Sequence, residues 1–423
     1  MVIERTYVND IKKNKEVFLQ GWVHDIRELP KARFILLRDI TGIVQCVLKQ
    51  DSKGFNEKLT LESVISVKGK VKDAKLTSEE LSVNDMEVLV DSLELLHKAE
   101  NLPMQVFEKD KNIMTDLSVR LDNRSLDLRK KRIQAIFKIQ SEIAGSFRDF
   151  FRKNNFIEIQ TPSIIASASE GGTSLFSVDY FEKKAYLAQS PQLYKQLATI
   201  SLEKVFTIAP VWRAEKHNTT RHLNESRQMD IEVAFADDFS AMKYLEECVS
   251  FIVSNVIKNC SKELNVLNLK LRVPKSKYLS YDEAVKLCKL KNGDDFSPED
   301  ERKLCNMFPD TIIFTHSWPI SLKPFYILPK DKKLSKGFDA LYNGIEISSG
   351  GQRVHIPEIL VKNLKDKGLN PKNFEFYVNS FKFGSPIHSG WSIGLERFTM
   401  SLLKLDNIRE AVLYPRDRDR IAP

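Results

Sequence analysis

Gly390-Trp-Ser-Ile-Gly-Leu-Glu-Arg-Phe398 places two glycines four positions apart, ahead of an apolar run that continues to Leu405. The pattern predicts a strand that ends in a tight turn and enters a helix, with Arg397 in the first helical turn. A helix start and a guanidinium group both attract phosphate. Taken alone, the stretch fits ordinary packing better than phosphate binding.

The composition is that of a globular chain large enough for two or three domains, with 423 residues, 42% hydrophobic and 29% charged. The net charge of +8 suits a polyanionic partner, and equally a merely lysine-rich chain. Five scattered cysteines without a Cys-x-x-Cys pair argue against a disulfide framework and a zinc site. Because the sequence shows no signal-peptide pattern and no long apolar run, we expect a cytoplasmic protein that does not enter a membrane.

Short apolar runs alternate with turn signals near the start of the chain, at 17–23, 33–39, 42–48, 63–71 and 86–96. Five strands in so short a segment predict an OB-fold β-barrel over residues 1–100. Such barrels bind single-stranded nucleic acid through aromatic side chains and basic grooves. Phe34 is a candidate stacking residue and Gln45 a candidate base reader, but a core Phe and a solvated Gln fit equally well.

The rest of the chain predicts a hinge over residues 101–131 and a second domain over 132–423. Apolar residues recur with helical spacing from Arg132 to Asn154, which predicts a long amphipathic helix. The segment that follows, Phe156 to Pro162, predicts a strand closed by proline. Residues 240–330 predict a helical insertion packed on the outside of this domain.

Polar residues of the second domain suggest a binding site. Glu170 precedes a double glycine, which indicates a mobile loop or a simple surface turn. Gln192 and Lys195 share one face of a predicted helix. Arg213 and Glu215 alternate on a predicted strand and therefore project to the same side. An arginine beside carboxylates on an inner face suggests an anionic ligand.

Two further carboxylates, Asp339 and Glu346, lie on a predicted strand pair near Ser349. Carboxylates with nearby hydroxyl groups suit a hard cation such as Mg²⁺, which takes a few protein oxygens and completes its shell with ligand phosphates.

Together these segments resemble the class II aminoacyl-tRNA synthetases of the aspartate, asparagine and lysine subgroup, and most of all the archaeal and eukaryotic aspartate type. Three signature motifs stand in order: the helix and strand ending in Pro162, the hairpin from Phe206 to Phe235 with Arg213, and Gly394-Leu-Glu-Arg397. The barrel matches the anticodon-binding domain of that subgroup, so the resemblance covers nearly the whole chain. It implies an α+β fold with an antiparallel sheet flanked by helices, and a homodimer.

The resemblance implies ATP as a substrate and Mg²⁺ as a cofactor. The positions that match ATP-binding residues are Arg213, Glu215, Arg221, His222, Leu223, Glu346, Gly394, Leu395, Glu396 and Arg397. Among them the implied catalytic residues are Arg213 on the α-phosphate, Arg397 on the γ-phosphate, and Glu346, which binds the metal with Asp339 and Ser349. Many members stack adenine on a phenylalanine near the end of the second-motif loop. This chain has Ser226 there, which leaves His222 as the candidate.

L-Aspartate is the amino acid that the resemblance implies. The matching positions are Glu170, Gln192, Lys195, Arg213, Asp230, Ser349 and Arg353. We expect Lys195 and Arg353 to form a pocket dominated by cations, in which Asp230 orients Lys195 without fully cancelling its charge. Such a pocket favours aspartate over asparagine, because a neutral amide leaves buried charge unpaired.

The positions that match tRNA anticodon contacts are His24, Arg27, Phe34 and Gln45. Strict members tend to carry tryptophan where His24 stands, so we predict that both tRNA(Asp) and tRNA(Asn) are charged.

The main alternative is an asparaginyl-tRNA synthetase, which shares the fold and the motifs. A second alternative, a paralogue that keeps only nucleic-acid binding or regulation, predicts loss of Arg213, Arg397 or Glu346, and all three are present. An asparagine synthetase built on the same core usually lacks the barrel.

Overall fold

The computed structural model describes residues 4–78, 80–107, 115–166 and 175–423. The chain divides into two compact units, Met1–Leu126 and Asp127–Pro423. Residues 101–126, predicted as part of a hinge, group with the first unit.

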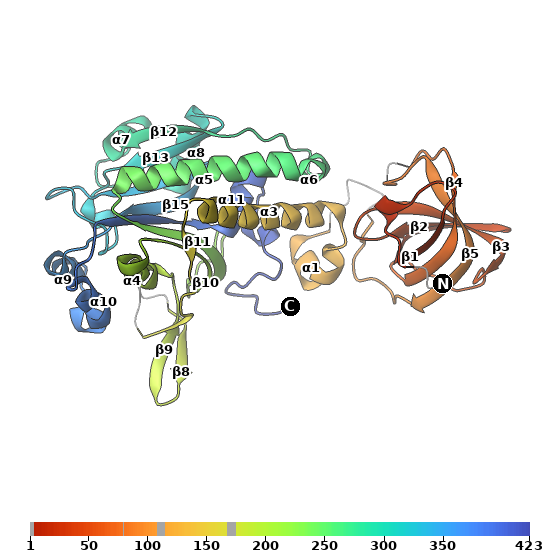
Figure 1. Ribbon diagram of the computed structural model, residues 1–423, viewed down its shortest axis with the longest axis horizontal. Coiled ribbons are helices and arrows are strands. Elements are labelled where there is room, and N and C mark those ends of the chain that lie inside the picture. Colours follow the sequence, from red (N-terminus) through yellow and green to blue (C-terminus); the bar gives the residue numbers. More distant parts are fainter. Residues whose placement is uncertain (1–3, 79, 108–114, 167–174) are drawn as a thin grey trace. The chain divides into compact units, whose positions relative to one another are not determined.

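The first unit contains a closed barrel with the strand order β1-β2-β3-β5-β4 (Figure 1). The strands are β1 (Glu16–Leu29), β2 (Ala32–Arg38), β3 (Ile43–Lys53), β4 (Val64–Asp73) and β5 (Met86–His97). Apolar residues on alternate positions point inward, among them Leu19, Ile35 and Val67. The predicted OB-type barrel is confirmed. The same part of the chain forms η1 (Val8–Asp10), α1 (Leu117–Asp122) and α2 (Arg124–Asp127).

The second unit is built on a large sheet, which in the described residues has the order β12-β13-β14-β15-β16-β11-β10-β6. Its strands are β6 (Ile157–Glu158), β10 (Lys204–Trp212), β11 (Glu225–Ala234), β12 (Lys275–Ser280), β13 (Thr311–His316), β14 (Gly337–Tyr342), β15 (Ile345–Gln352) and β16 (His388–Gly394). Neighbours pair antiparallel, except that β12 pairs parallel with β13 and β6 with β10. The expected antiparallel sheet is thus present with a parallel pair at each edge.

Two long helices, α3 (Lys131–Lys153) and α5 (Asp238–Asn259), lie side by side across one face of the sheet (Figure 1). One stripe of α3 is apolar and buried, which confirms the helix predicted for this segment. Its Phe147 meets Trp391 of β16 edge-on, with 6.3 Å between ring centroids. The core therefore supports the central strands from behind and leaves their other face for polar side chains.

The shorter helices of the second unit connect or cover the strands. They are α4 (Gln192–Leu202), α6 (Ser261–Val266), α7 (Tyr281–Cys288), α8 (Pro298–Met307), α9 (Pro357–Asp366), α10 (Glu375–Phe381), α11 (Leu395–Leu403), η2 (Ile320–Leu322), η3 (Pro371–Phe374) and η4 (Ile408–Ala411).

The region 240–330 differs from the external helical insertion that the sequence suggested. Its strands β12 and β13 are part of the large sheet. Buried residues of α5, including Leu245 and Ile252, belong to the main core. Helical periodicity identified α5, but periodicity cannot distinguish a helix on a core from one outside it.

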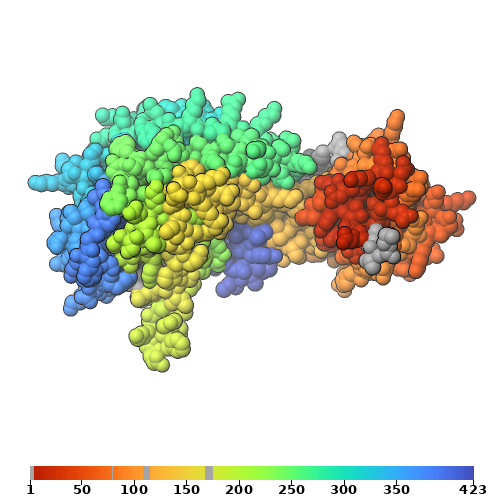
Figure 2. Space-filling view, in the orientation of Figure 1, coloured from red at the N-terminus to blue at the C-terminus, as the bar shows by residue number. Residues whose placement is uncertain are grey.

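A small sheet of β7 (Ile164–Ile165), β8 (Ser177–Tyr180) and β9 (Lys183–Leu187) has the order β7-β9-β8. Figure 2 shows the β8–β9 hairpin standing out from the rest of the second unit. Among the described residues, no helix is long and apolar enough to cross a membrane.

Candidate functional site

A row of polar residues runs across four neighbouring strands of the large sheet. Asp230 of β11 pairs with Ser392 of β16, Ser392 with Ser349 of β15, and Ser349 with Asp339 of β14. Residues directly opposite each other on antiparallel strands share one face. The strand register therefore brings an amino-acid-site candidate, Asp230, and two metal-site candidates onto the same surface.

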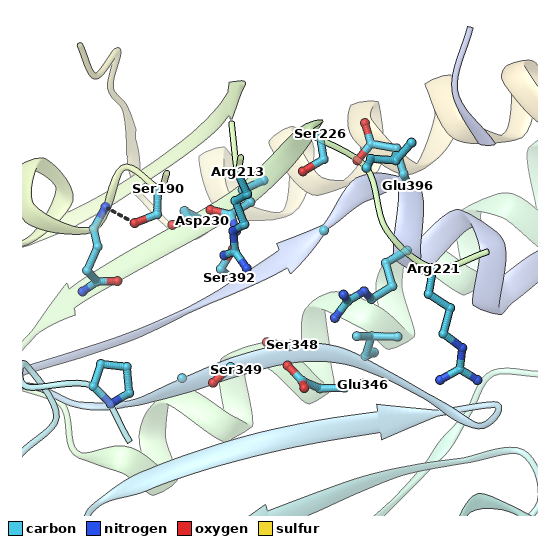
Figure 3. Close-up of a pocket in the computed structure, with 18 of the residues that line it drawn as sticks. Ser190, Arg213, Arg221, Ser226, Asp230, Glu346, Ser348, Ser349, Ser392 and Glu396 are labelled. Carbon is cyan, nitrogen blue, oxygen red and sulfur yellow. Dashed lines mark hydrogen bonds between the residues drawn. The ribbon is translucent and has the colours of Figure 1, made fainter. Parts of the chain in front are cut away.

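A cavity of about 340 Å³ opens over this surface (Figure 3). The predicted site residues that line it are Gln192, Arg213, Glu215, Arg221, His222, Leu223, Asp230, Glu346, Ser349, Arg353, Gly394, Glu396 and Arg397. In Figure 3, Arg213 reaches toward β15, which carries Glu346, Ser348 and Ser349. Most of the residues predicted from separate parts of the chain are thus brought together.

Arg213 and Glu215 stand in the loop that follows β10, because the strand ends at Trp212 and not at residue 215 as expected. The backbone at Arg213 is nevertheless fixed. Its N–H donates to the Asn224 carbonyl at 2.9 Å, and the Asn224 amide donates back to the Arg213 carbonyl at 2.7 Å. These two hydrogen bonds fix the end of the β10–β11 hairpin, and this places the Arg213 guanidinium group in the cavity.

The loop between β10 and β11 carries Arg221 and His222. Arg221 pairs with Glu301 of α8 at 3.1 Å and donates to the Gly344 carbonyl at 3.3 Å. Burial lowers the pKa of His222, although Glu215, 3.8 Å away, raises it. His222 is therefore mainly neutral near pH 7, and it lines the same cavity as Ser226, where its ring could meet a ligand.

The turn at the end of β16 has the predicted form. β16 ends at Gly394, α11 begins at Leu395, and Arg397 lies in its first turn beside the cavity. Leu395 differs from the prediction, since it packs into the main core and does not line the cavity. Its contribution to a nucleotide site is therefore to anchor the helix that carries Arg397.

Glu396 is buried, and both of its carboxyl oxygens accept from the backbone N–H of Arg227, at 3.1 and 3.0 Å. Burial raises the pKa of Glu396 to about 7 from an ordinary 4.5, although the Arg227 N–H lowers it.

We expect the Glu396→Gln variant to gain stability over the unsubstituted protein as pH rises. The folded pKa lies above the unfolded one, so the stabilising effect of protonated Glu396 is full below about pH 4.5 and is lost as pH passes about 7. Glutamine keeps an acceptor oxygen and cannot ionise. Melting temperatures at about pH 5 and about pH 8 should therefore diverge in favour of the variant. The same difference at both pH values would contradict the titration.

Four charged side chains form a buried cluster at one end of the polar row. Lys195 lies 2.9 Å from Asp230 and 3.5 Å from Glu232. Arg353 donates from Nε and Nη2 to the two oxygens of Glu232, at 2.9 and 3.2 Å. Although burial raises the pKa of Glu232, the charges of Arg353 and Lys195 hold it below the ordinary value. The carboxylate is therefore ionised and paired.

This cluster corrects the expectation of a pocket dominated by cations. Two positive and two negative side chains balance, because Glu232, to which no role was assigned, cancels the second cation. Lys195 is 1% exposed and does not line the cavity, so it acts through Asp230. Arg353 does line the cavity, and its Nη1 remains for a ligand after Nε and Nη2 have bound Glu232.

Gly390 makes room for the cluster. A Cβ atom at Gly390 would lie 2.3 Å from a carboxyl oxygen of Glu232, its partner across the strands. The absence of a side chain at Gly390 therefore leaves room for the Glu232–Arg353 pair. Gly394, by contrast, borders the cavity.

Gln192 starts α4 at the cavity, but its amide already donates to Gln196 at 2.7 Å. Glu170, the other residue predicted to meet an α-ammonium group, lies outside the described residues.

The carboxylates of Asp339 and Glu346 fit a shared cation. Loss of solvation, followed by repulsion from Asp339, raises the pKa of Glu346 to about 7, which a bound cation would reverse. Asp339 is held by the ammonium group of Lys323, and Ser349 stands opposite it on β15. No group of three or more His, Cys, Asp or Glu in the described residues can hold a metal alone. The donor set therefore suits an ion that arrives with phosphate oxygens.

The cavity residues Gln228, Ser348 and Ser392 were not predicted from the sequence, unlike Asp230. Buried polar atoms of Gln228, Asp230, Ser348 and Ser392 have no hydrogen-bond partner in the described part of the chain. All four residues line the cavity, and unpaired buried polar groups of this kind mark a place for ligand or water. Gln228 could have been found, since it alternates with Asp230 and Glu232 along β11. Ser392 is identified only by strand pairing.

Of the four predicted anticodon contacts, three lie together on the barrel surface and the fourth, His24, is buried. Arg27 of β1 pairs with Phe34 of β2, and Gln45 of β3 lies two residues from Val47, the other neighbour of Phe34. These three side chains share the outer face and are at least partly exposed. Gln45 donates to Glu87 at 2.8 Å.

His24 differs from its prediction as an anticodon contact. It lies at a bulge between Val23 and Asp25, and its side chain is buried, at 6% exposed. There it bonds Arg38 at 2.9 Å, within a buried Arg38–Glu62 ion pair. Alternation along β1 could not reveal this, because a bulge shifts the register by one residue.

Comparisons with known proteins agree with this arrangement. Residues 116–418 match the family described as "tRNA synthetases class II (D, K and N)", and residues 17–96 match the "OB-fold nucleic acid binding domain". The chain belongs to the class II tRNA synthetases. The match spans every residue of the cavity described above.

Relatives of this synthetase align over nearly its full length. An "Aspartate--tRNA(Asp/Asn) ligase" of Methanocaldococcus jannaschii is 44% identical, covering 99% of this chain and 98% of its own. An "Aspartate--tRNA(Asp) ligase" of Picrophilus torridus is 43% identical, covering 99% and 100%. Among solved structures, an asparaginyl-tRNA synthetase from Pyrococcus horikoshii superposes with a TM-score of 0.93 at 33% identity, covering 100% of both chains. An aspartyl-tRNA synthetase from Entamoeba histolytica gives 0.90 at 32%, covering 100% and 93%.

Proposed function

We propose that this class II synthetase activates L-aspartate with ATP and transfers the aspartyl group to tRNA(Asp) and tRNA(Asn). The observation that carries the proposal is the buried Lys195–Asp230–Glu232–Arg353 cluster beside a cavity lined by Arg213 and Arg397. At one end of the cavity Arg353 offers a fixed guanidinium group for a carboxylate, and elsewhere Arg213 and Arg397 offer guanidinium groups for phosphates. Relatives that are more than 40% identical carry the name of aspartate ligases.

In the proposed reaction the α-carboxylate of aspartate attacks the α-phosphorus of ATP and pyrophosphate leaves, which gives an aspartyl-adenylate. The ribose hydroxyl at the tRNA end then takes the aspartyl group and AMP leaves. Both reactants of the first step are anions, so the protein contributes positioning and positive charge and needs no covalent nucleophile. Arg213 serves the α-phosphate and Arg397 the γ-phosphate. Mg²⁺ held by Asp339, Glu346 and Ser349 would neutralise phosphate charge.

Specificity for aspartate would come from Arg353, which lines the cavity and whose Nη1 donors are not used by Glu232, while Nε and Nη2 hold the guanidinium plane against Glu232. An asparagine side chain would offer one oxygen and two donors, and those donors would meet a cation. The alternative, an asparaginyl-tRNA synthetase, shares the fold but finds less support, because the relatives at 40–44% identity are named for aspartate.

The proposal is tested by ATP–pyrophosphate exchange with aspartate, asparagine and lysine in turn, followed by charging of tRNA(Asp) and tRNA(Asn). We expect exchange with aspartate alone and charging of both tRNAs. Exchange with asparagine alone would overturn the amino-acid assignment. Charging restricted to tRNA(Asp) would overturn the relaxed tRNA choice and leave the rest standing.

Phe34→Ala should leave exchange unchanged and lower kcat/KM for tRNA charging by roughly tenfold or more, because stacking on an aromatic ring contributes about 1–3 kcal/mol per base. Phe18→Ala is a matched control. It also removes a part-buried aromatic ring from the barrel, but at the place where β1 pairs with β4. Equal losses in exchange and charging would place Phe34 in the structural core instead.

We also propose that the synthetase is a homodimer. Among the residues that the structure describes, β6 is the last strand at one edge of the large sheet, and Ile157 on it is 47% exposed. An apolar residue on an unpaired edge suits contact with a second copy. A monomer mass in light scattering at micromolar concentration would contradict this.

A further inference from the structure

The loop between β10 and β11 is held from outside by the last part of the chain. The N–H of Ile408, in η4, donates to the Thr220 carbonyl at 2.9 Å. The N–H of Asn224 donates to the Arg416 carbonyl at 2.8 Å, and Arg418 Nη1 donates to the Lys216 carbonyl at 3.1 Å. These three hydrogen bonds hold the loop at its middle, its end and its start, in that order.

Arg409 lies at the centre of this contact and is 9% exposed. Its Nη2 donates to Asn218 Oδ1 at 2.6 Å and its Nη1 to the Thr219 carbonyl at 3.1 Å. On the other side, its Nε donates to Asp417 at 2.5 Å. Asn218 also donates to Asp419. One guanidinium group thus joins the loop to the segment 415–423.

The second half of the loop is also held by Arg221, which pairs with Glu301 of α8 and donates to the Gly344 carbonyl. Residues 216–220 are exposed, so they add no apolar side chain to the core. Their neighbours Arg221 and His222 line the cavity. A loop that is ordered before its ligand arrives loses less conformational entropy on binding than one that must be ordered by the ligand. The contacts of Arg409 with the loop therefore bear on ligand affinity more than on folding.

We propose that Arg409 is a positioning residue: with Asn218 and the segment 415–423 it forms a clamp that sets the loop carrying Arg221 and His222 over the ATP site. The proposal rests on the proposed function for the identity of the ligand, ATP. Arg409 itself does not line the cavity and acts only through the loop.

Two variants open the clamp from opposite sides. Arg409→Met keeps the length of the side chain and removes its donors, and Asn218→Ala removes the loop's acceptor without touching η4. In exchange assays each should raise KM for ATP by roughly tenfold, the effect of one charge-assisted hydrogen bond. The KM for aspartate should stay near that of the unsubstituted protein in both variants, and so should the melting temperature of Asn218→Ala. Arg409→Met leaves Asp417 without its ion-pair partner and should lower the melting temperature. Arg272→Ala, which breaks an exposed ion pair with Asp310, is the matched control.

The double variant tests whether Arg409 and Asn218 act through one shared hydrogen bond or independently of each other. Because Arg409 and Asn218 share one bond, the double variant should raise KM for ATP no more than either single variant does. Limited trypsin digestion gives a readout that does not need activity. Cleavage after Lys216 and Arg221 should be faster in both single variants than in the control, and ATP should slow it.

An unchanged KM for ATP together with unchanged cleavage would overturn the clamp. So would a parallel fall in melting temperature, kcat and both affinities, which would show a purely structural role. If the unsubstituted protein gave no aspartate-dependent exchange, the proposed function would fail on its own, and the cleavage rates with and without ATP would still decide whether the clamp exists.

Discussion

Replacing Arg353 with alanine should lower kcat/KM for aspartate in pyrophosphate exchange by roughly 10³-fold. The change removes the guanidinium group proposed to meet the substrate side chain and leaves Glu232, which is 0% exposed, without its two-point partner. Truncating one partner of a buried, hydrogen-bonded charge pair between two molecules costs about 2–5 kcal/mol of binding, and a factor of 10³ in kcat/KM corresponds to about 4 kcal/mol. KM for ATP, measured in the same assay at saturating aspartate, should change far less.

A double variant controls for damage to the fold. Glu232→Gln combined with Arg353→Gln removes both charges, so the melting temperature should recover toward that of the unsubstituted protein while aspartate activation stays poor. A folded Arg353→Ala protein with an unchanged KM for aspartate would refute the assignment. Recovery of activity in the double variant would show that Arg353 serves only to balance Glu232.

Arg213→Ala should lower kcat for exchange by roughly 10²–10³-fold, the loss seen when one preorganised donor to a developing charge is removed. The affinities for aspartate and ATP should fall less, since the interaction strengthens as the α-phosphorus is attacked. Arg213→Lys should restore part of the rate, because it keeps the charge and loses the planar fork.

The matched control is Arg227→Ala on the same hairpin. Arg227 pairs with Glu225 at 2.9 Å, and its side chain does not line the cavity. Its backbone N–H, which Glu396 accepts, is untouched by the substitution. A kcat for Arg213→Ala within tenfold of the control would place Arg213 outside the chemical step.

The sequence predicted features that depend on neighbours along the chain. The turn at Gly394 and the position of Arg397 follow from two glycines and an apolar run, and the structure has both. The burial of one face of α3 follows from its apolar spacing. Phe34 and Gln45 share a face because strand alternation fixes side-chain direction where no bulge intervenes.

Features that depend on pairing across the chain were missed. The sequence shows Glu232 two positions after Asp230 but cannot show that Arg353, 121 residues later, faces it. Lys323 and Glu301 reach the site from a region interpreted as an external insertion. The bulge at His24 likewise depends on pairing with the partner strand, β2.

Ligand binding depends on the correct pairing of β11, β16, β15 and β14, because the polar row crosses all four strands. A slip of one residue at any of these three strand pairs would move every side chain beyond it to the opposite face. Asp230 and Asp339 could then no longer act on one substrate pair, even in a molecule with native helix content. The activity recovered after refolding would therefore measure the fraction of molecules with the correct strand register. Circular dichroism would also include molecules whose strands are out of register.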